Sequence, residues 1–213
     1  MKNFIWIAGI VIVLIALMFL LTSGGGMAFN PPLEVGVVNP ADHVTGNASS
    51  SIVIVEYSDF QCPACRSYYS IMRQIVTQFG TKIAFVYRYF PLIEIHSNAQ
   101  FSAQAAEAAG KQGKFWEMHD LLFEKQSEWE NVADVEPLFE SYATLLGINV
   151  DQFRADFRSK AVIDFVNAER ANAIKLGLQG TPTFFVNGKQ IQNPSSADAF
   201  TAIVQDTING KSQ

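Results

Sequence analysis

Two strand-like segments flank a helix-like segment between Ile52 and Tyr89, and they constrain the fold more than any other part of this 213-residue chain. The first, Ile52 to Tyr57, is apolar and rich in β-branched residues, as a buried strand is. A helical pattern runs from Cys62 to Phe79 and ends at Gly80, and a second strand pattern covers Lys82 to Tyr89. This order predicts a βαβ unit with parallel strands.

The rest of the chain has the pattern of several helices, a hairpin and a last helix. Apolar residues repeat at helical spacing from Asn98 to Val166, and Gly110, Gly147 and Gly177 stand where helix C-caps are expected. We therefore expect a helical insertion at about residues 97–177, between the second strand and the hairpin.

A strand and a turn signal follow these helices. Thr183 to Val186 predicts a strand, and Asn187-Gly188 is a strong signal for a hairpin turn into a returning strand. Ser195 or Ser196 is expected to cap a final helix that runs to about Ile208.

An apolar segment from Phe4 to Leu21 precedes this body. Its eighteen residues carry no charge, and as a helix they would reach roughly 27 Å, close to the thickness of the bilayer's hydrocarbon core. Lys2 precedes the segment, and no Lys or Arg follows it until Arg66. The positive-inside rule then places the N-terminus in the cytoplasm and the body outside.

These patterns predict the organisation of the chain. Residues 1–3 form a cytoplasmic start, 4–21 a single transmembrane signal anchor, and 22–50 a Gly-, Pro-, Asn- and Ser-rich tether with a short edge strand at Leu33–Val38. The folded domain is expected at 51–213.

Two other interpretations of the apolar segment remain open. It could be a signal peptide cleaved at the small residues around Gly26-Met27-Ala28, although signal h-regions are usually about 7–15 residues long. It could also be a buried core helix. Either membrane interpretation places the body in an oxidising compartment.

Composition excludes several classes of protein. Aromatic residues make up 12% of the chain, enough to build a core, so the chain is not disordered. No second apolar run approaches spanning length, which excludes a multi-span membrane protein. The net charge is −5 and no basic cluster is present, which argues against a nucleic-acid partner.

The two cysteines, Cys62 and Cys65, are the chain's candidate for chemistry. They stand three apart at the start of the first predicted helix, with Pro63 suited to its first turn. Free N–H groups and the positive end of the helix dipole at Cys62 should lower its pKa and favour the reactive thiolate. We expect Cys62 to be exposed and Cys65, one turn further on, to be more buried.

Two alternatives compete with a redox pair. The cysteines could be half of a zinc site, with ligands from His43, His96 and His119, but these histidines have no spacing motif. They could also form an inert structural disulfide, although so short a loop removes little chain entropy. We expect no metal and no cofactor other than the cysteine pair.

Two segments resemble the DsbA-like branch of the thioredoxin superfamily, especially its membrane-anchored bacterial thiol–disulfide oxidoreductases. They are Val53-Ile54-Val55-Glu56-Tyr57-Ser58-Asp59-Phe60-Gln61-Cys62-Pro63-Ala64-Cys65 and Gly180-Thr181-Pro182-Thr183-Phe184-Phe185-Val186-Asn187-Gly188. The resemblance implies an α/β thioredoxin-like fold with a central mixed sheet, helices on both faces and an inserted helical subdomain, preceded by the transmembrane helix.

The resemblance also implies roles for further residues. Thr181-Pro182 matches the family's cis-proline loop, which lies against the CxxC motif and binds the substrate chain. Glu56 matches a buried acidic residue that relays a proton to or from the resolving thiol, here Cys65; a Glu on an edge face, paired with a Lys, is the alternative. His96 belongs to a segment that also resembles the branch, but a capping or packing role fits it better than a chemical one.

The resemblance implies a dithiol oxidase whose Cys62–Cys65 disulfide oxidises unfolded exported proteins. Its expected partner is a membrane quinone-linked oxidoreductase that reoxidises the pair, and the protein is expected to be a membrane-anchored monomer with its catalytic domain outside the cytoplasm. A reductase or isomerase of the same fold is one alternative. A peptide-binding chaperone module with a structural disulfide is another.

Overall fold

The computed structural model describes residues 34–210. The predicted anchor at 4–21 and the first part of the predicted tether lie outside these residues. Within residues 34–210, no helix is both long enough and apolar enough to cross a bilayer.

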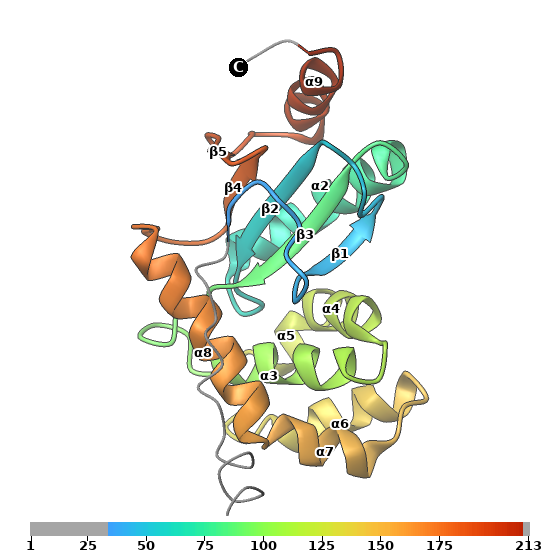
Figure 1. Cartoon of the computed structure of the whole chain (residues 1–213). Coiled ribbons are helices and arrows are strands. Elements are labelled where there is room, and N and C mark those ends of the chain that lie inside the picture. The colour runs from blue at the N-terminus through green and yellow to red at the C-terminus, as the bar shows by residue number, and fades with distance from the viewer. Residues whose placement is uncertain (1–33, 211–213) are drawn as a thin grey trace, which may run out of the picture. The chain divides into compact units, whose positions relative to one another are not determined.

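A mixed five-stranded sheet forms the centre of the described domain, in the order β1-β3-β2-β4-β5 (Figure 1). β2 (Val53–Ser58) pairs in parallel with β3 (Ala84–Tyr89), which confirms the βαβ prediction. β4 (Thr183–Val186) pairs antiparallel with β2. β1 (His43–Gly46) and β5 (Lys189–Gln190) are the edges, so β2 is the central strand and all six of its residues are buried.

The helices of the described residues fall into a pair beside the sheet and a group between β3 and β4. The pair is α2 (Pro63–Phe79) and α9 (Ala197–Ile208). The group is α3 (Ala99–Gly110), α4 (Phe115–Glu124), α5 (Gln126–Trp129), α6 (Glu136–Leu145), α7 (Val150–Phe157) and α8 (Lys160–Lys175). This group is the predicted helical insertion.

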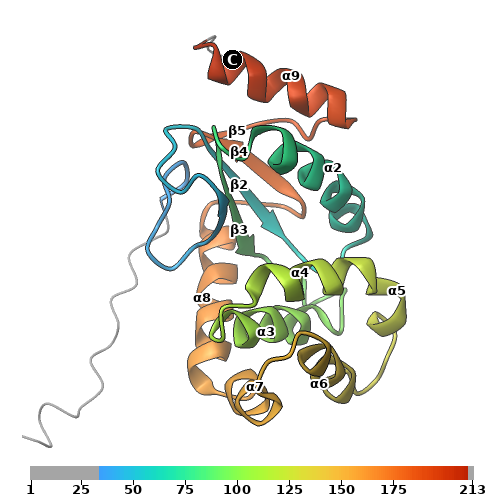
Figure 2. The ribbon, with the colours of Figure 1, turned by 90° about the vertical axis from the view of Figure 1, so that its right-hand side faces the viewer.

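The sheet is covered on both faces, as the fold prediction required (Figure 2). α2 and α9 pack on one face, where Met72 and Phe200 join Ile54 in one buried cluster. On the other face the end of α8 contributes Ala173 to a cluster with Val55. The helices α3 to α7 gather beyond one end of the sheet (Figures 1 and 2).

Local signals in the sequence set several element ends. Asn187 and Gly188 adopt positive φ angles of 47° and 81° between β4 and β5, which confirms the hairpin turn. Ser196 Oγ accepts a hydrogen bond from the N–H of Ala199 and caps α9. Gly147 and Gly177 also take positive φ at helix ends, as predicted.

The prediction for Gly110 was wrong. Gly110 is the last residue of α3 and lacks a positive φ, whereas Gly113 has φ 74°. The cause is a further turn after the helix, closed by a hydrogen bond from Gly113 N–H to the carbonyl of Gly110. The left-handed residue therefore comes three positions later.

The predicted edge strand at Leu33–Val38 was also wrong, since no strand is present over its described residues, 34–38. The carbonyls of Glu34 and Val37 accept hydrogen bonds from the guanidinium of Arg88 on β3 instead of from a neighbouring strand. The edge strand is β1, which lies within the predicted tether. The described part of that tether, residues 34–50, is thus packed against the sheet.

Candidate active site

The two cysteines lie at the start of α2, directly after the central strand. Cys62 is the N-cap residue, with extended backbone angles, and Pro63 occupies the first turn. Cys65 is fully buried, while Cys62 is 7% exposed. The predicted difference in exposure is present, but Cys62 is more covered than predicted, because the Thr181 loop lies over it. Both cysteines are free thiols in this structure.

The Thr181–Pro182 loop lies against Cys62, although 119 residues separate them in sequence. The Thr181–Pro182 peptide bond is cis. The Cys62 Sγ lies 3.5 Å from the backbone carbonyl oxygen of Thr181. The structure therefore brings together the cysteine pair and the loop that the sequence resemblance linked to it.

The surroundings of the two thiols move their pKa values in opposite directions. A hydrogen bond from Cys65 is the largest effect on Cys62, and with the N–H groups at the start of α2 it lowers the Cys62 pKa to about 5. Burial raises the pKa of Cys65 well above its usual value, and the neighbouring Cys62 and Glu56 raise it further. At neutral pH Cys62 is a thiolate and Cys65 a thiol.

Glu56 is buried in the central strand, which precedes the cysteines in the chain. It is 3% exposed, and its Oε1 accepts a hydrogen bond of 2.7 Å from the hydroxyl of Ser58. Burial raises the Glu56 pKa to about 8, so this carboxyl carries a proton at neutral pH. A central-strand position excludes the alternative of a Glu on an edge face.

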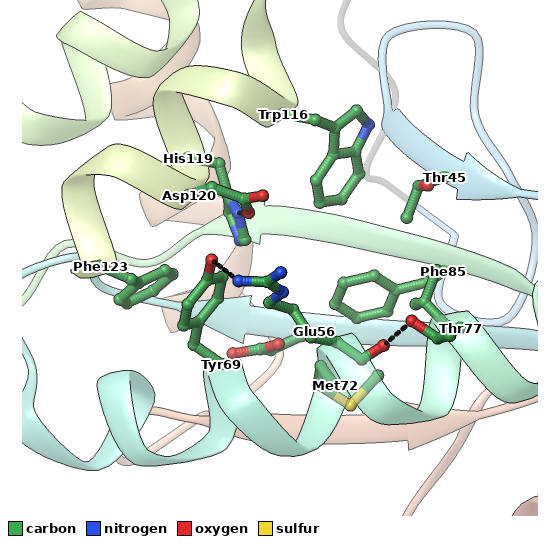
Figure 3. Close-up of a pocket in the computed structure, with 12 residues that line it drawn as sticks. Thr45, Glu56, Tyr69, Met72, Thr77, Phe85, Trp116, His119, Asp120 and Phe123 are labelled. Carbon is green, nitrogen blue, oxygen red and sulfur yellow. Dashed lines mark hydrogen bonds and ion pairs between the residues drawn. The ribbon is translucent and has the colours of Figure 1, made fainter. Parts of the chain in front are cut away.

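A cavity of about 170 Å³ lies beside Glu56, between α2 and α4 (Figure 3). Its apolar wall includes Met72, Phe85 and Trp116, and its polar lining includes Glu56 and His119. A cavity of this size can hold several water molecules. Glu56 is therefore next to space that can carry a proton to or from the buried site.

Asp59 organises the loop between β2 and the cysteines. Its buried carboxylate accepts hydrogen bonds from Gln61 N–H at 2.8 Å and from Leu92 N–H at 3.0 Å. The Nδ1 of His96 lies 2.7 Å from the same carboxylate, which raises the His96 pKa. The backbone carbonyl of Asp59 also accepts a hydrogen bond from the N–H of Cys62. His96 thus fixes the loop, in line with the capping role expected for it.

The sequence did not point to several residues of this site. Gln126 on α5 donates from Nε2 to the carbonyl oxygens of Phe60, at 2.6 Å, and Cys62, at 3.2 Å. Tyr87 on β3 joins Cys65 in one buried cluster. Neither has a local motif. Ser58 could have been found from its spacing, since residues two apart on a strand share a face and Glu56 was already a candidate.

The three histidines considered for a zinc site lie next to different carboxylates. His43 is 2.7 Å from Glu107, His96 pairs with Asp59, and His119 Nδ1 is 2.9 Å from Asp120. Among residues 34–210 no group of three or more His, Cys, Asp or Glu side chains could hold a metal ion.

Comparison with known proteins places this arrangement in a family. A family model described as Thioredoxin (Thioredoxin_4) matches residues 38–206. The solved structure of oxidised BdbD from Bacillus subtilis is similar, with a TM-score of 0.73 and 23% identity, over 85% of this chain and 100% of that one. alpha-DsbA1 from Wolbachia pipientis has a TM-score of 0.73 and 20% identity, over 82% and 94%. A thioredoxin-like oxidoreductase from Silicibacter pomeroyi DSS-3 has a TM-score of 0.66 and 25% identity, over 80% and 94%.

Curated relatives match the chain over only part of their own length. A protein of Salinispora arenicola named Na(+)/H(+) antiporter NhaA 1 is 38% identical over 178 residues, which are 84% of this chain and 26% of that protein. Na(+)/H(+) antiporter NhaA 3 of Salinispora tropica is 40% identical, over 83% and 26%. The chain spans about a quarter of the length of these relatives, so the name antiporter belongs to much longer proteins.

Proposed function

The chain belongs to the thioredoxin family, and from this premise we propose that it is a DsbA-like thiol–disulfide oxidoreductase, a dithiol oxidase that introduces disulfides into exported proteins. One observation carries the proposal. Cys62 has a pKa of about 5 at the start of α2, against the Thr181–Pro182 loop, while its partner Cys65 is buried and remains a thiol. These are the properties of an attacking and a resolving cysteine.

The proposed reaction starts from the Cys62–Cys65 disulfide. A thiolate of an unfolded substrate attacks Sγ of Cys62, the disulfide breaks, and Cys65 leaves as a thiolate. A second thiolate of the substrate then attacks the substrate sulfur that is bonded to Cys62 in the mixed disulfide. A substrate disulfide forms, and Cys62 leaves as a thiolate. Two electrons pass from the substrate to the cysteine pair.

We assign Glu56 the role of proton donor in the first step. With a pKa of about 8 it is protonated at neutral pH. The leaving Cys65 has a raised pKa and needs a proton to remain buried without charge. Glu56 gives up its proton to Cys65 and recovers one through the adjacent cavity (Figure 3).

The low pKa of Cys62 favours oxidation over reduction as the direction of the reaction. A stabilised thiolate lowers the free energy of the reduced pair, which makes the disulfide form a stronger oxidant. A reductase or isomerase needs a reduced pair that gives up its electrons readily. The lowered pKa of Cys62 therefore supports the oxidase over the reductase or isomerase.

The compartment and the partners follow from the same proposal. The uncharged segment at 4–21, with Lys2 before it, would anchor the protein with its N-terminus in the cytoplasm and its catalytic domain outside. The substrate is an unfolded exported chain held by Thr181 and Pro182. The reduced pair is reoxidised by a quinone-linked membrane protein. Deleting residues 1–21 should move the protein from the membrane fraction to the soluble fraction.

Substitution of each cysteine tests the assignment. Cys62→Ser should abolish oxidation of a reduced dithiol peptide, whereas Cys65→Ser should accumulate a mixed disulfide on Cys62 that mass spectrometry detects. Ser70→Ala, on the exposed side of α2, is the control and should keep wild-type activity. Full activity of Cys62→Ser would overturn the proposal.

A further inference from the structure

The hydroxyl of Tyr87 is buried and makes no hydrogen bond of full geometry among residues 34–210, although the hydroxyl of Ser58 lies near enough to lower the Tyr87 pKa. Tyr87 is 0% exposed. A buried polar group without a partner costs roughly 1–3 kcal/mol, and such groups in folded proteins call for an explanation. Tyr87 lies on β3, beside the central strand that leads to the cysteines.

Tyr87 shares its surroundings with Glu56 and Cys65. Tyr87 is the direct register partner of Glu56 in the parallel β2–β3 pairing, so both residues lie on the face of the sheet that α2 covers. Tyr87 and Cys65 belong to one buried cluster. Burial is the largest cause of the raised Tyr87 pKa. Charge on Cys65 raises this pKa further, charge on Glu56 does so to a smaller extent, and a hydrogen bond with the Ser58 hydroxyl lowers it.

Aromatic neighbours hold the ring of Tyr87 in place. Phe60 stacks on it with centroids 5.0 Å apart, and His119 meets it edge-on at 4.9 Å. Phe115 is 5.8 Å away. A ring fixed in this way keeps its O–H in place before the reaction, and a donor that needs no reorganisation stabilises developing charge effectively.

We propose that the Tyr87 hydroxyl is a hydrogen-bond donor reserved for the sulfur of Cys65 while that sulfur carries negative charge. This assignment rests on the proposed function, since it deepens the step in which Cys65 leaves. In that step the substrate thiolate bonds to Cys62 Sγ, the Cys62–Cys65 bond breaks, and the electron pair stays on Cys65. Tyr87 stabilises this thiolate until the proton of Glu56 reaches it. Tyr87 keeps its own proton and acts only by donating this hydrogen bond.

The chain provides a matched control for Tyr87→Phe. The hydroxyl of Tyr142, on α6 in the helical insertion, is also buried and also makes no hydrogen bond of full geometry among the described residues, although the carboxylate of Glu128 lies near it. Each Tyr→Phe change removes a buried hydroxyl that has no hydrogen bond of full geometry, and keeps the ring. Neither variant should therefore lower the urea midpoint of unfolding.

The test is the reaction of the oxidised protein with reduced glutathione, quenched with acid and followed by mass spectrometry. Tyr87→Phe should slow formation of the mixed disulfide about tenfold, the effect of losing one hydrogen bond of about 1.4 kcal/mol, while Tyr142→Phe reacts at the wild-type rate. In the Cys62→Ser background, Tyr87→Phe should also raise the pKa of Cys65, measured from thiolate absorbance at 240 nm.

The outcomes separate the two proposals. If the wild-type disulfide does not react with glutathione, the proposed function fails, while the absorbance titration of Cys65 still tests Tyr87. If the wild type reacts and Tyr87→Phe is within twofold of it, with an unchanged Cys65 titration, the Tyr87 assignment is overturned. A marked loss of stability in Tyr87→Phe alone would also overturn it, because the hydroxyl would then have a structural partner.

Discussion

At the scale of single residues, the site depends on the different environments of its two thiols. Cys62 and Cys65 are one helical turn apart, yet one thiol lies at a helix N-terminus and the other in a closed core. The two residues between them, Pro63 and Ala64, provide no charged side chain to stabilise a thiolate. Hydrogen bonds from the thiol of Cys65 and from the N–H groups of the first turn stabilise the Cys62 thiolate instead.

The first prediction concerns the pH dependence of Cys62. The rate of alkylation of the reduced protein by iodoacetamide should rise with pH around a midpoint of about 5, because only the thiolate reacts. Cys65→Ala should move the midpoint upward, since it removes the largest stabilising hydrogen bond. A midpoint near 8.5 in the wild type, the value of an ordinary cysteine, would contradict this explanation of the reactivity.

The second prediction concerns Glu56. Its folded-state pKa of about 8 lies above the unfolded value, so its protonated form favours the folded state. This contribution is complete below about pH 4.3 and is lost as the pH rises through about 8. The wild type should therefore lose folding stability on the order of a few kcal/mol between pH 4.5 and pH 8, measured by urea unfolding. Glu56→Gln should not show this loss, because Gln does not titrate.

Glu169 provides the comparison for Glu56. It is also buried with a pKa raised to about 8, mainly by burial, and it accepts the N–H of Tyr89 instead of contacting the cysteines. Glu169→Gln should flatten the pH dependence of stability in the same way, and it should leave glutathione reactivity unchanged. Equal loss of reactivity in both variants would show that Glu56 has no special role.

At the scale of elements, the sequence predicted those turns, caps and helices that depend on residues close together in the chain. The Asn187-Gly188 turn, the Ser196 cap and the helix after Cys62 each depend on a few neighbouring residues, and each was predictable. β1 was not, because a four-residue edge strand has almost no pattern of its own and is positioned by its pairing with β3. The same limit applied to Gln126, Tyr87 and the link between Asp59 and His96, which arise from distant contacts.

The third prediction concerns the segment before β1. The Arg88 guanidinium is fully buried and forms two hydrogen bonds of 2.9 Å with the Asp42 carboxylate. Asp42→Ala leaves this charge without its carboxylate and should cost about 3–5 kcal/mol in urea unfolding. Arg158→Ala, which breaks an exposed pair with Glu136, should cost less than about 1 kcal/mol. Similar losses in the two variants would contradict the anchoring role of Arg88.

At the scale of the whole domain, the helical insertion helps to build the site as well as to cover the sheet. Gln126 joins it to the backbone at Cys62, Asn98 on the loop before α3 donates to three carbonyls at residues 129–132, and the Asn98 N–H donates to Gln61. The family resemblance predicted that the insertion exists. It did not predict these contacts, because they depend on how the helices pack.

The reduction potential of the Cys62–Cys65 pair, measured by equilibration with glutathione, tests the central claim most directly. Stabilisation of the reduced form by the Cys62 thiolate predicts an oxidising potential, above about −180 mV, in the range between protein disulfide isomerase and DsbA. A value near about −270 mV, as for thioredoxin, would contradict the account and would make the domain a reductase.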